Sequence, residues 1–238
     1  MGSVGSRADA AGPSEPKVGA PRVAASLERV DDVAPLLEEA GEGAGVTEGL
    51  SLTSVHLEGV RAPGVPLAFT ELSASRVEHC MFQGCDFSKS WFVDVAFEDC
   101  DFSNCLFEDA NFTRCSFTSC KLIGADLSDA RLMRTRVAEC ALNLASFVRA
   151  KLEDCVIQAS DLTGADLSYG AQKRTAFWDC VLEGTSFFRM GLSGMDLSSC
   201  RLGALTISDS MEELKGCRMD LIQAAGIAKR LGVIIVDA

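Results

Sequence analysis

The residues best suited to chemistry in this chain are its 11 cysteines, because a thiolate can bind a metal, form a disulfide or attack a substrate. Ten of them fall on a strict count of five: Cys80, Cys85, Cys100, Cys105, Cys115, Cys120, Cys140, Cys155, Cys180 and Cys200. Only Cys217 lies outside this count. A metal site would instead need several ligands that converge on one point, often with histidine among them.

The two histidines do not complete a catalytic or metal-binding set. His56 and His79 lie outside the cysteine count, so neither is placed to activate a thiol. The sequence also contains no glycine-rich phosphate loop and no Ser/His/Asp set. We therefore expect a protein that is not an enzyme and that has no cofactor and no metal. In this interpretation the cysteines are buried and act as small apolar residues.

A bulky apolar residue follows two positions after each of these small residues. From Phe82 to Leu202 every fifth residue is Phe, Leu, Ile or Val, except Gln172, and the count extends upstream to Leu52 and downstream to Ile207. A period of five fits neither a strand nor an α-helix, whose side chains repeat every 2 and 3.6 residues. It suits a solenoid in which each quintet forms one short side and then turns. Both the bulky and the small residue then point inward.

This pattern resembles the pentapeptide-repeat family. Its motif, a small residue followed by Asp or Asn and a bulky apolar residue, occurs at Cys85-Asp86-Phe87, Ala110-Asn111-Phe112, Ala125-Asp126-Leu127 and Ala165-Asp166-Leu167. The resemblance implies an all-β solenoid, a right-handed quadrilateral β-helix with four quintets in each coil. Residues 50–209 would then form about eight coils, and rungs about 4.8 Å apart would give a rod roughly 38 Å long.

Composition and charge limit the classes of function. The 238 residues carry a formal net charge of −12 at pH 7, which disfavours direct binding to nucleic acid. The sequence has no apolar run long enough for a transmembrane helix and no secretory signal at its start. Because many cysteines without an export signal indicate a reducing compartment, we expect a cytoplasmic protein without a membrane partner.

The segments before the repeat have no five-residue count. Residues 1–25 are rich in Ala, Gly, Pro and Ser, and we expect them to be a disordered tail. Residues 26–49 are expected to form a short helix and linker, because the stretch from Ser26 has an amphipathic pattern that Pro35 interrupts.

The segment after the repeat, residues 210–238, is predicted to cap the solenoid or to form a dimer. Asp220 and Gln223 make a capping-box signature for a helix over residues 221–231. The apolar run at residues 233–236 then predicts a strand. The predicted cap is therefore a helix followed by a strand.

Sorting the charged residues by their position in the coil gives one basic side between two acidic sides. The basic side includes the partner-binding candidates Arg131, Arg134, Lys173 and Arg174. The acidic candidates are Asp86, Glu98, Asp99, Glu108, Asp109, Asp126 and Asp129. Two acidic sides on a rod little wider than a double helix could present a duplex-like field to a basic groove. A solvated surface without this role is the alternative.

One fault interrupts the repeat at "SYGAQKRTAF", residues 168–177. Gln172 replaces the bulky apolar residue, and Gly170 replaces the small one. Because a buried Gln needs hydrogen-bond partners, we predict a local bulge that displays Tyr169, Lys173 and Arg174 for contact with a partner.

The C-terminal segment resembles the ending of Qnr-type pentapeptide-repeat proteins, which protect DNA gyrase from quinolones. The matching positions are Leu214, Gly216, Gln223, Ala224, Leu231 and Gly232. The resemblance implies a non-enzymatic DNA mimic that binds DNA gyrase or topoisomerase IV as a tail-to-tail homodimer. The dimerisation candidates are Leu221, Ala225, Ala228, Leu231, Val233 and Ile235. Two alternatives remain open: the helix only caps its own last coil, or the protein is a scaffold for an unrelated protein partner.

Overall fold

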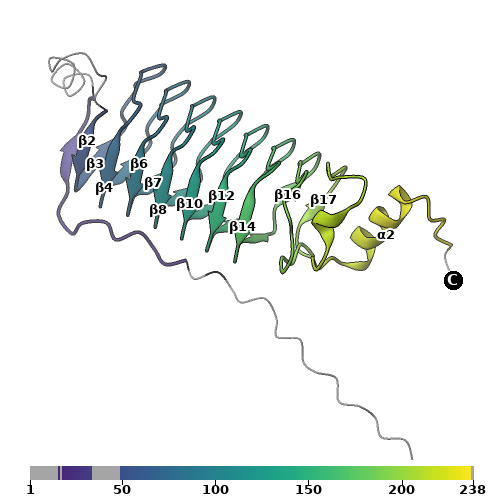
Figure 1. Ribbon diagram of the computed structural model, residues 1–238. Coiled ribbons are helices and arrows are strands. Elements are labelled where there is room, and N and C mark those ends of the chain that lie inside the picture. Colours follow the sequence, from purple (N-terminus) through teal and green to yellow (C-terminus); the bar gives the residue numbers. More distant parts are fainter. Residues whose placement is uncertain (1–15, 17, 34–48, 237–238) are drawn as a thin grey trace, which may run out of the picture.

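The computed structural model describes Pro16, residues 18–33 and residues 49–236, which fold into one β-solenoid with a single α-helix at its C-terminal end. From β2 onward each strand pairs in parallel with the strand one coil further along, for example Leu132 with Leu152. The rungs therefore stack along one axis, as Figure 1 shows. The predicted quadrilateral β-helix of about eight coils is confirmed.

Two sides of the square are regular parallel sheets. Side A consists of β1 (Glu28–Val30), β3 (Val55–Glu58), β5 (Arg76–Glu78), β7 (Ala96–Glu98), β9 (Ser116–Thr118), β11 (Arg136–Ala138), β13 (Val156–Gln158) and β15 (Ala176–Trp178). Side B consists of β2 (Ser51–Thr53), β4 (Glu71–Ser73), β6 (Trp91–Val93), β8 (Asn111–Thr113), β10 (Arg131–Met133), β12 (Lys151–Glu153) and β14 (Ala171–Lys173).

The other two sides pair more sparsely. Side C is joined by single bridges such as Met81 to Asp101, and by β16 (Val181–Leu182) with β17 (Arg201–Leu202). Side D is joined by bridges such as Asp86 to Leu106. The chain follows the order B, A, C and D in each coil, so sides A and D are opposite and side B lies between them.

The interior is built from the two inward positions of each quintet. The bulky residues pack in columns along the axis: the Phe92 and Phe112 rings stack with centroids 4.9 Å apart, and those of Phe97 and Phe117 with centroids 4.6 Å apart. Nearly all of these bulky residues are buried, and burying one such side chain contributes about 1.5–3 kcal/mol. The small residues fill the space beside each column.

Each corner of the square is a tight turn at the residue two positions after the bulky one. Asp94, Arg114 and Arg134, at the corner between sides B and A, have φ angles of 58°, 54° and 54°. This left-handed conformation is uncommon outside glycine, although Asp and Asn adopt it more readily than most residues. It turns the chain sharply and leaves the corner side chains on the outer surface.

The predicted bulge at residues 168–177 is wrong. Gln172 lies in β14 in regular register with Leu152, and its amide Nε2 donates hydrogen bonds of 3.2 Å to the carbonyl oxygens of Gly191 and Ser193. The side chain thus bonds to the next coil where the sheet of side B ends. Packing explains why residue 170 is a glycine. A Cβ there would lie 2.9 Å from the carbonyl oxygen of Leu167 and 3.2 Å from the sulfur of Met190.

The N-terminal predictions also need correction where the structure describes the chain. The segment from Ser26 does not start a helix: Glu28–Val30 is β1, which adds a first rung to side A by pairing with β3. Pairing with an exposed sheet edge is more favourable here than an isolated short helix. Residues 18–25 of the predicted disordered tail follow the rod, and the Ala24 N–H donates to the Ala74 carbonyl oxygen. Residues 1–15, 17 and 34–48 lie outside the described part.

The C-terminal end continues the coil beyond residue 209, but this last coil is slightly longer than the others. Asp196 pairs with Arg218, beyond the position that the regular repeat would give, and this longer coil contains the 3-10 helix η1 (Glu212–Leu214). The helix α2 (Leu221–Arg230) follows, with the predicted capping box between Asp220 and Gln223. The predicted strand at residues 233–236 is wrong, because this run has no paired neighbour within the described chain. In the described residues no helix is long and apolar enough to cross a bilayer.

Candidate functional site

The cysteines that follow the count of five are structural. All ten are buried, and their thiols donate to backbone carbonyl oxygens, as Cys105 does to Phe82 at 2.8 Å. Burial raises the pKa of the Cys115 and Cys155 thiols to about 12. A thiol with this pKa stays protonated near pH 7 and is a poor nucleophile. Among the described residues, no cluster of His, Cys, Asp and Glu is arranged to hold a metal ion.

The structure distributes the predicted partner-binding residues over three sides of the rod. Side D and its corner with side B carry Asp86, Glu108, Asp109, Asp126, Asp129 and Tyr169. Side A and its corner with side C carry Glu98 and Asp99. Side B and its corner with side A carry Arg131, Arg134, Lys173 and Arg174. The acidic candidates therefore face opposite directions and cannot form one flat site.

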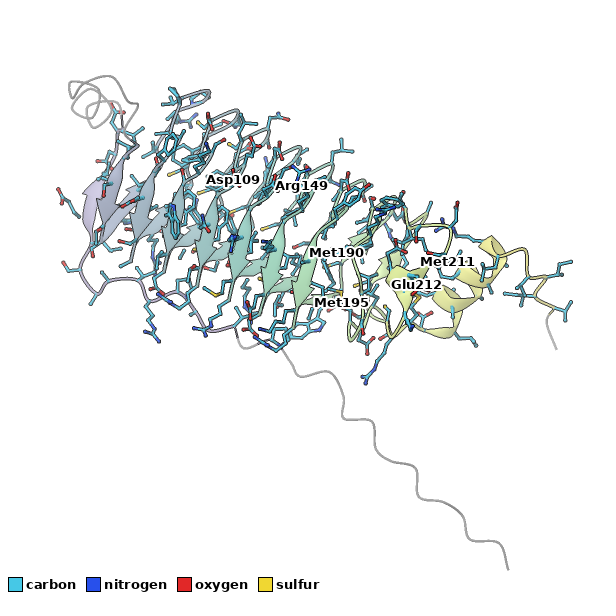
Figure 2. All side chains as sticks on the ribbon, in the orientation of Figure 1. Asp109, Arg149, Met190, Met195, Met211 and Glu212 are labelled. Carbon is cyan, nitrogen blue, oxygen red and sulfur yellow. The ribbon has the colours of Figure 1, made fainter. Side chains whose placement is uncertain are left out.

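Side D holds the densest group of carboxylates. Glu108 and Asp109 are exposed, and Asp126 and Asp129 lie one rung further along. The Arg149 guanidinium forms two hydrogen bonds of 2.9 and 2.6 Å with Asp129 and holds its pKa below the ordinary value. Within the described residues the other three form no ion pair. Figure 2 shows Asp109 and Arg149 along the same edge of the rod.

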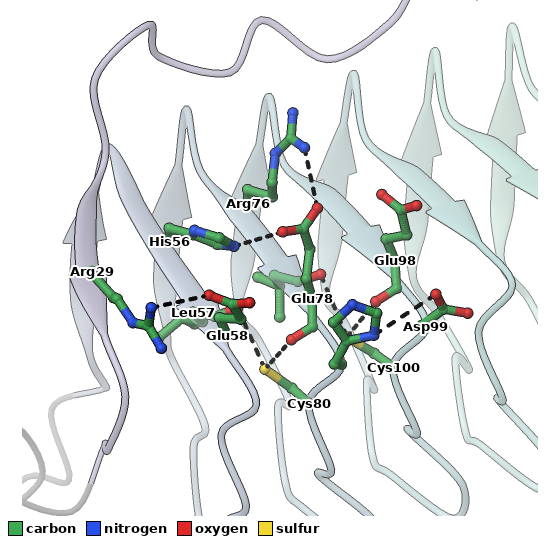
Figure 3. A network of polar contacts seen from close by, with 12 residues as sticks. Arg29, His56, Leu57, Glu58, Arg76, Glu78, Cys80, Glu98, Asp99 and Cys100 are labelled. Carbon is green, nitrogen blue, oxygen red and sulfur yellow. Dashed lines mark hydrogen bonds and ion pairs between the residues drawn. The ribbon is translucent and has the colours of Figure 1, made fainter.

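Side A combines acidic and basic residues near its N-terminal end. Figure 3 shows His56 and Arg76 both directed at Glu78, at 2.6 and 3.1 Å. Burial alone would raise the pKa of Glu78, but the hydrogen bonds from Arg76 and His56 hold it below its ordinary value. Glu98 is the next carboxylate in this column, and the described chain contains no ion pair to it. The negative charge of side A is therefore least neutralised from Glu98 onward.

Side B is less basic than the sequence predicted, because ion pairs neutralise part of it. Lys173 contacts Glu153 at 2.6 Å, and Arg174 forms two hydrogen bonds of 2.5 and 2.7 Å with Asp154. Arg131 and Lys151 are exposed and lie opposite each other in adjacent strands, and the described residues form no ion pair with either. These two residues are the main unpaired positive charges on the flat face of side B.

Tyr169 belongs to a small exposed aromatic group that the sequence did not reveal as a group. Its ring packs edge-on against Phe188 with centroids 5.5 Å apart, and the Arg189 guanidinium lies within 5.8 Å of both ring centres. The fold brings Tyr169 and Phe188 together because they are about one coil apart in the sequence. Because four quintets make one coil of 20 residues, the spacing of Tyr169 and Phe188 in the sequence could have indicated this pair.

The C-terminal segment exposes an unusual amount of apolar surface. Leu221 and Leu231 are 86% and 64% exposed, while Ala225 and Ala228 are half-buried. The candidates Val233 and Ile235 are also exposed. Ile222 and Ile234 are not among the predicted dimerisation residues, although they are 84% and 87% exposed. Ile222 lies off the helix face that Leu221, Ala225 and Ala228 share, and Ile234 follows the end of α2.

Side-chain hydrogen bonds attach α2 to the last coil. Gln223 donates from Nε2 to the carbonyl oxygens of Leu197 and Cys200, at 2.9 and 2.7 Å. Arg230 donates to the carbonyl oxygen of Leu205 at 2.6 Å. No residue of α2 is fully buried: Ala225, Ile227 and Ala228 are half-buried, while Leu221 and Ile222 are exposed. In the described chain these polar contacts therefore help to hold the helix in place.

Comparison with known proteins agrees with this architecture. The family model described as a pentapeptide repeat region matches residues 90–167 and 110–187. No curated protein sequence matches the chain.

Several solved structures share the solenoid. A trypsin-treated variant of QnrB1, a plasmid-mediated fluoroquinolone resistance protein, is 22% identical with a TM-score of 0.53 and covers 79% of this chain and 99% of its own. A second such variant is 20% identical with a TM-score of 0.52, covering 79% and 100%. HetL, a pentapeptide repeat protein from Nostoc sp. strain PCC 7120, is 18% identical with a TM-score of 0.48, covering 79% and 95%. Residues 90–187 therefore form a pentapeptide repeat region, and the same five-residue count and stacked square coils continue on both sides of it.

Proposed function

We propose that this protein is a non-catalytic DNA mimic that binds the DNA-binding surface of a type II topoisomerase, DNA gyrase or topoisomerase IV, and can protect it from fluoroquinolones. The observation that carries the proposal is the exposed carboxylates on the opposite sides A and D of a rod with the fold of QnrB1. A DNA duplex also presents negative charge in opposite directions across its width.

The charge density of side D supports mimicry. Glu108, Asp109, Asp126 and Asp129 lie within two rungs, which corresponds to about one carboxylate per 2.4 Å of axis at a rung spacing of about 4.8 Å. Duplex DNA carries one charge per roughly 1.7 Å. Arg149 offsets one of the four. The net density is then about one charge per 3.2 Å, roughly half that of duplex DNA and of the same sign. A basic groove shaped for DNA would be attracted to this side.

The same proposal includes a homodimer formed through the C-terminal segment. Exposed Leu221, Ile222, Leu231 and Ile234 supply apolar surface, and a second copy of this segment is a chemically matched partner for it. Two rods joined end to end would double the length of the acidic surface.

The test uses purified gyrase, the full chain and three double variants. Glu108→Lys with Asp109→Lys reverses side D, and Glu98→Lys with Asp99→Lys reverses side A. Arg131→Glu with Lys151→Glu reverses the charge of side B and serves as the control. We expect each acidic reversal to weaken gyrase binding and fluoroquinolone protection at least tenfold. The side B variant should change them less than twofold.

Two results would contradict the proposal. One is the absence of gyrase binding, supercoiling inhibition and protection at a several-fold molar excess of the wild-type protein. The other is equal loss in all three variants, which would indicate a general effect of charge rather than recognition of the acidic sides.

A second candidate function is a scaffold for a different protein, bound through side B. Trp91 and Met133 are 54% and 40% exposed on this side, close to Arg131 and Lys151. Trp, Met and Arg are enriched in protein interfaces. If the side B variant alone loses its partner in cell extract while gyrase is not bound, the scaffold replaces the topoisomerase mimic.

A further inference from the structure

The N-terminal segment follows one corner of the rod. Three hydrogen bonds attach it to successive rungs between sides B and A: Glu28 N–H to the Ser54 carbonyl, Ala24 N–H to the Ala74 carbonyl, and Arg22 N–H to Asp94 Oδ1 at 3.1 Å. The segment therefore runs from the first coil towards the middle of the rod, as Figure 1 shows below the strands.

Beside this segment the corner forms a pocket. Its volume is about 630 Å³, and it is open to solvent. The N-terminal segment contributes Gly19, Ala20 and Arg22, and the corner contributes Arg114, Arg134, Asp154 and Arg174. Because the corner residues occupy the same position in successive coils, they stack one above another along the pocket wall.

The pocket has more positive than negative groups. Arg114 forms two hydrogen bonds with Asp94, at 2.7 and 2.6 Å, and Arg174 forms two with Asp154. The guanidinium groups of Arg22 and Arg134 have no ion pair in the described part of the chain. Arg174 also donates to Glu153 at 3.2 Å, so four arginines line the pocket and three carboxylates lie beside them.

We propose that this pocket binds a small oxyanion of the phosphate class, as free phosphate or as the phosphoryl group of a phosphorylated side chain. Arg22 and Arg134 would bind it, because a guanidinium fork matches phosphate oxygens in a bidentate manner. Asp94 and Asp154 hold Arg114 and Arg174 in fixed orientations beside the ligand. Since Arg22 belongs to the N-terminal segment, the bound anion also attaches that segment to the rod.

The size and surroundings of the pocket favour a small ligand over a nucleic acid. The N-terminal segment closes one flank, and the acidic residues of side A lie beyond the same corner. A long polyanion would meet those carboxylates, whereas a single phosphoryl group would not.

The first experiment is calorimetric titration of the full chain at low ionic strength with inorganic phosphate, pyrophosphate, O-phosphoserine and, as a monoanion control, acetate. We expect saturable binding of the phosphate compounds and none of acetate. Arg134→Gln and Arg22→Gln should each weaken binding at least tenfold. Arg131→Gln, an exposed arginine in the same coil that does not line the pocket, should change it less than twofold.

A second measurement tests the link to the N-terminal segment. Pyrophosphate should slow tryptic cleavage after Arg22 at least threefold in the wild-type protein and not in Arg134→Gln. Tighter binding of O-phosphoserine than of phosphate would identify a phosphorylated side chain as the ligand, and the reverse would identify the free ion. Both results support the proposal.

The proposal is overturned if phosphate and pyrophosphate do not bind, or if Arg134→Gln and Arg131→Gln weaken binding equally while both keep the wild-type circular dichroism spectrum. Neither result depends on gyrase, so this site and the topoisomerase mimic are tested separately.

Discussion

The two ends of the rod are covered in different ways. At the N-terminal end, β1 extends side A, and the apolar side chains of Val33 and Leu50 are 3% and 5% exposed. At the C-terminal end, Gln223 and Arg230 attach α2 through hydrogen bonds. The large apolar side chains of Leu221 and Ile222 in this second cap are exposed instead.

This difference indicates which end is available for assembly. A parallel sheet leaves unpaired N–H and C=O groups at each edge, and both caps reduce that exposure. The first cap also buries its apolar residues, whereas the second leaves Ile222 84% exposed. The C-terminal end is therefore the one at which a second chain could bury additional apolar surface.

The largest expected effect is on the oligomeric state. Leu221→Glu combined with Ile222→Glu should halve the mass measured by light scattering, because it places charge in the proposed dimer interface. Leu144→Glu is the matched control, since Leu144 is 69% exposed on the body of the rod. A mass that is the same in wild-type protein and both variants would rule out dimerisation through α2.

The next largest effect is on the free energy of unfolding, and it differs between one apolar residue from each end. Val33→Asp should lower the free energy of unfolding by about 3 kcal/mol, because it buries a charge without a partner. Ile222→Asp should change it by less than about 0.5 kcal/mol in dilute protein, where no partner chain covers the site. Urea unfolding followed by circular dichroism measures both, and equal losses would show that the ends are not different.

A smaller effect is expected at Glu213, a carboxylate in η1 that connects the last coil to the rod. It accepts hydrogen bonds from Arg189 N–H at 2.8 Å, Ser208 N–H at 3.1 Å and Ser208 Oγ at 2.7 Å. Glu213→Ala should cost about 2 kcal/mol, because three part-buried hydrogen bonds lose their buried acceptor.

The exposed neighbour Glu212 supplies the control for that experiment. Glu212→Ala should stay within about 0.5 kcal/mol of wild type. Urea midpoints give both values. If both variants match wild type, Glu213 does not stabilise the C-terminal end.

The smallest effect is a pH dependence of stability at the corner where the N-terminal segment contacts the rod. The Arg114 guanidinium and the Arg22 N–H hold the pKa of Asp94 below its ordinary value. A depressed carboxyl pKa gives stability that is complete above the unfolded pKa of about 4 and is lost as the pH falls through the folded pKa. Asp94→Asn should remove about 1 kcal/mol near pH 7.

Thermal unfolding at pH 7 and near pH 3 checks this sign. The difference between wild type and Asp94→Asn should shrink at the lower pH. The exposed corner residue Asp109 supplies the control, because within the described chain its side chain forms no ion pair. Asp109→Asn should change the unfolding temperature at pH 7 much less than Asp94→Asn does. A gap between wild type and Asp94→Asn that widens on acidification would contradict the assignment.

The repeat could be predicted almost completely, while its faults could not. Phe82, Cys100 and Leu127 show their inward orientation through spacing alone, because a stacked solenoid repeats the same environment in every coil. Gln172 breaks the spacing, and the bulge predicted there is wrong. Its actual partners, the carbonyls of Gly191 and Ser193, lie on the next rung, where no local pattern shows them.

Charge was harder to predict than packing. The sequence assigned Lys173 and Arg174 to a basic surface, but Glu153 and Asp154 lie beside them one rung earlier and neutralise them. Both pairs join residues that are one coil apart in the same column. Whether such side chains meet depends on their conformations, which the count of five does not give. The segment at Arg22 had no repeat at all, so its position along the corner could not be derived.

The sequence alone therefore determined the solenoid, the buried thiols and the sides on which charges lie, since every coil repeats the same local geometry. The tertiary structure decided how the ends close, which charges remain unpaired and where the N-terminal segment runs. These features depend on contacts between positions that do not share the repeat, and their free energies come from hydrogen bonds and ion pairs whose partners only the folded chain brings together.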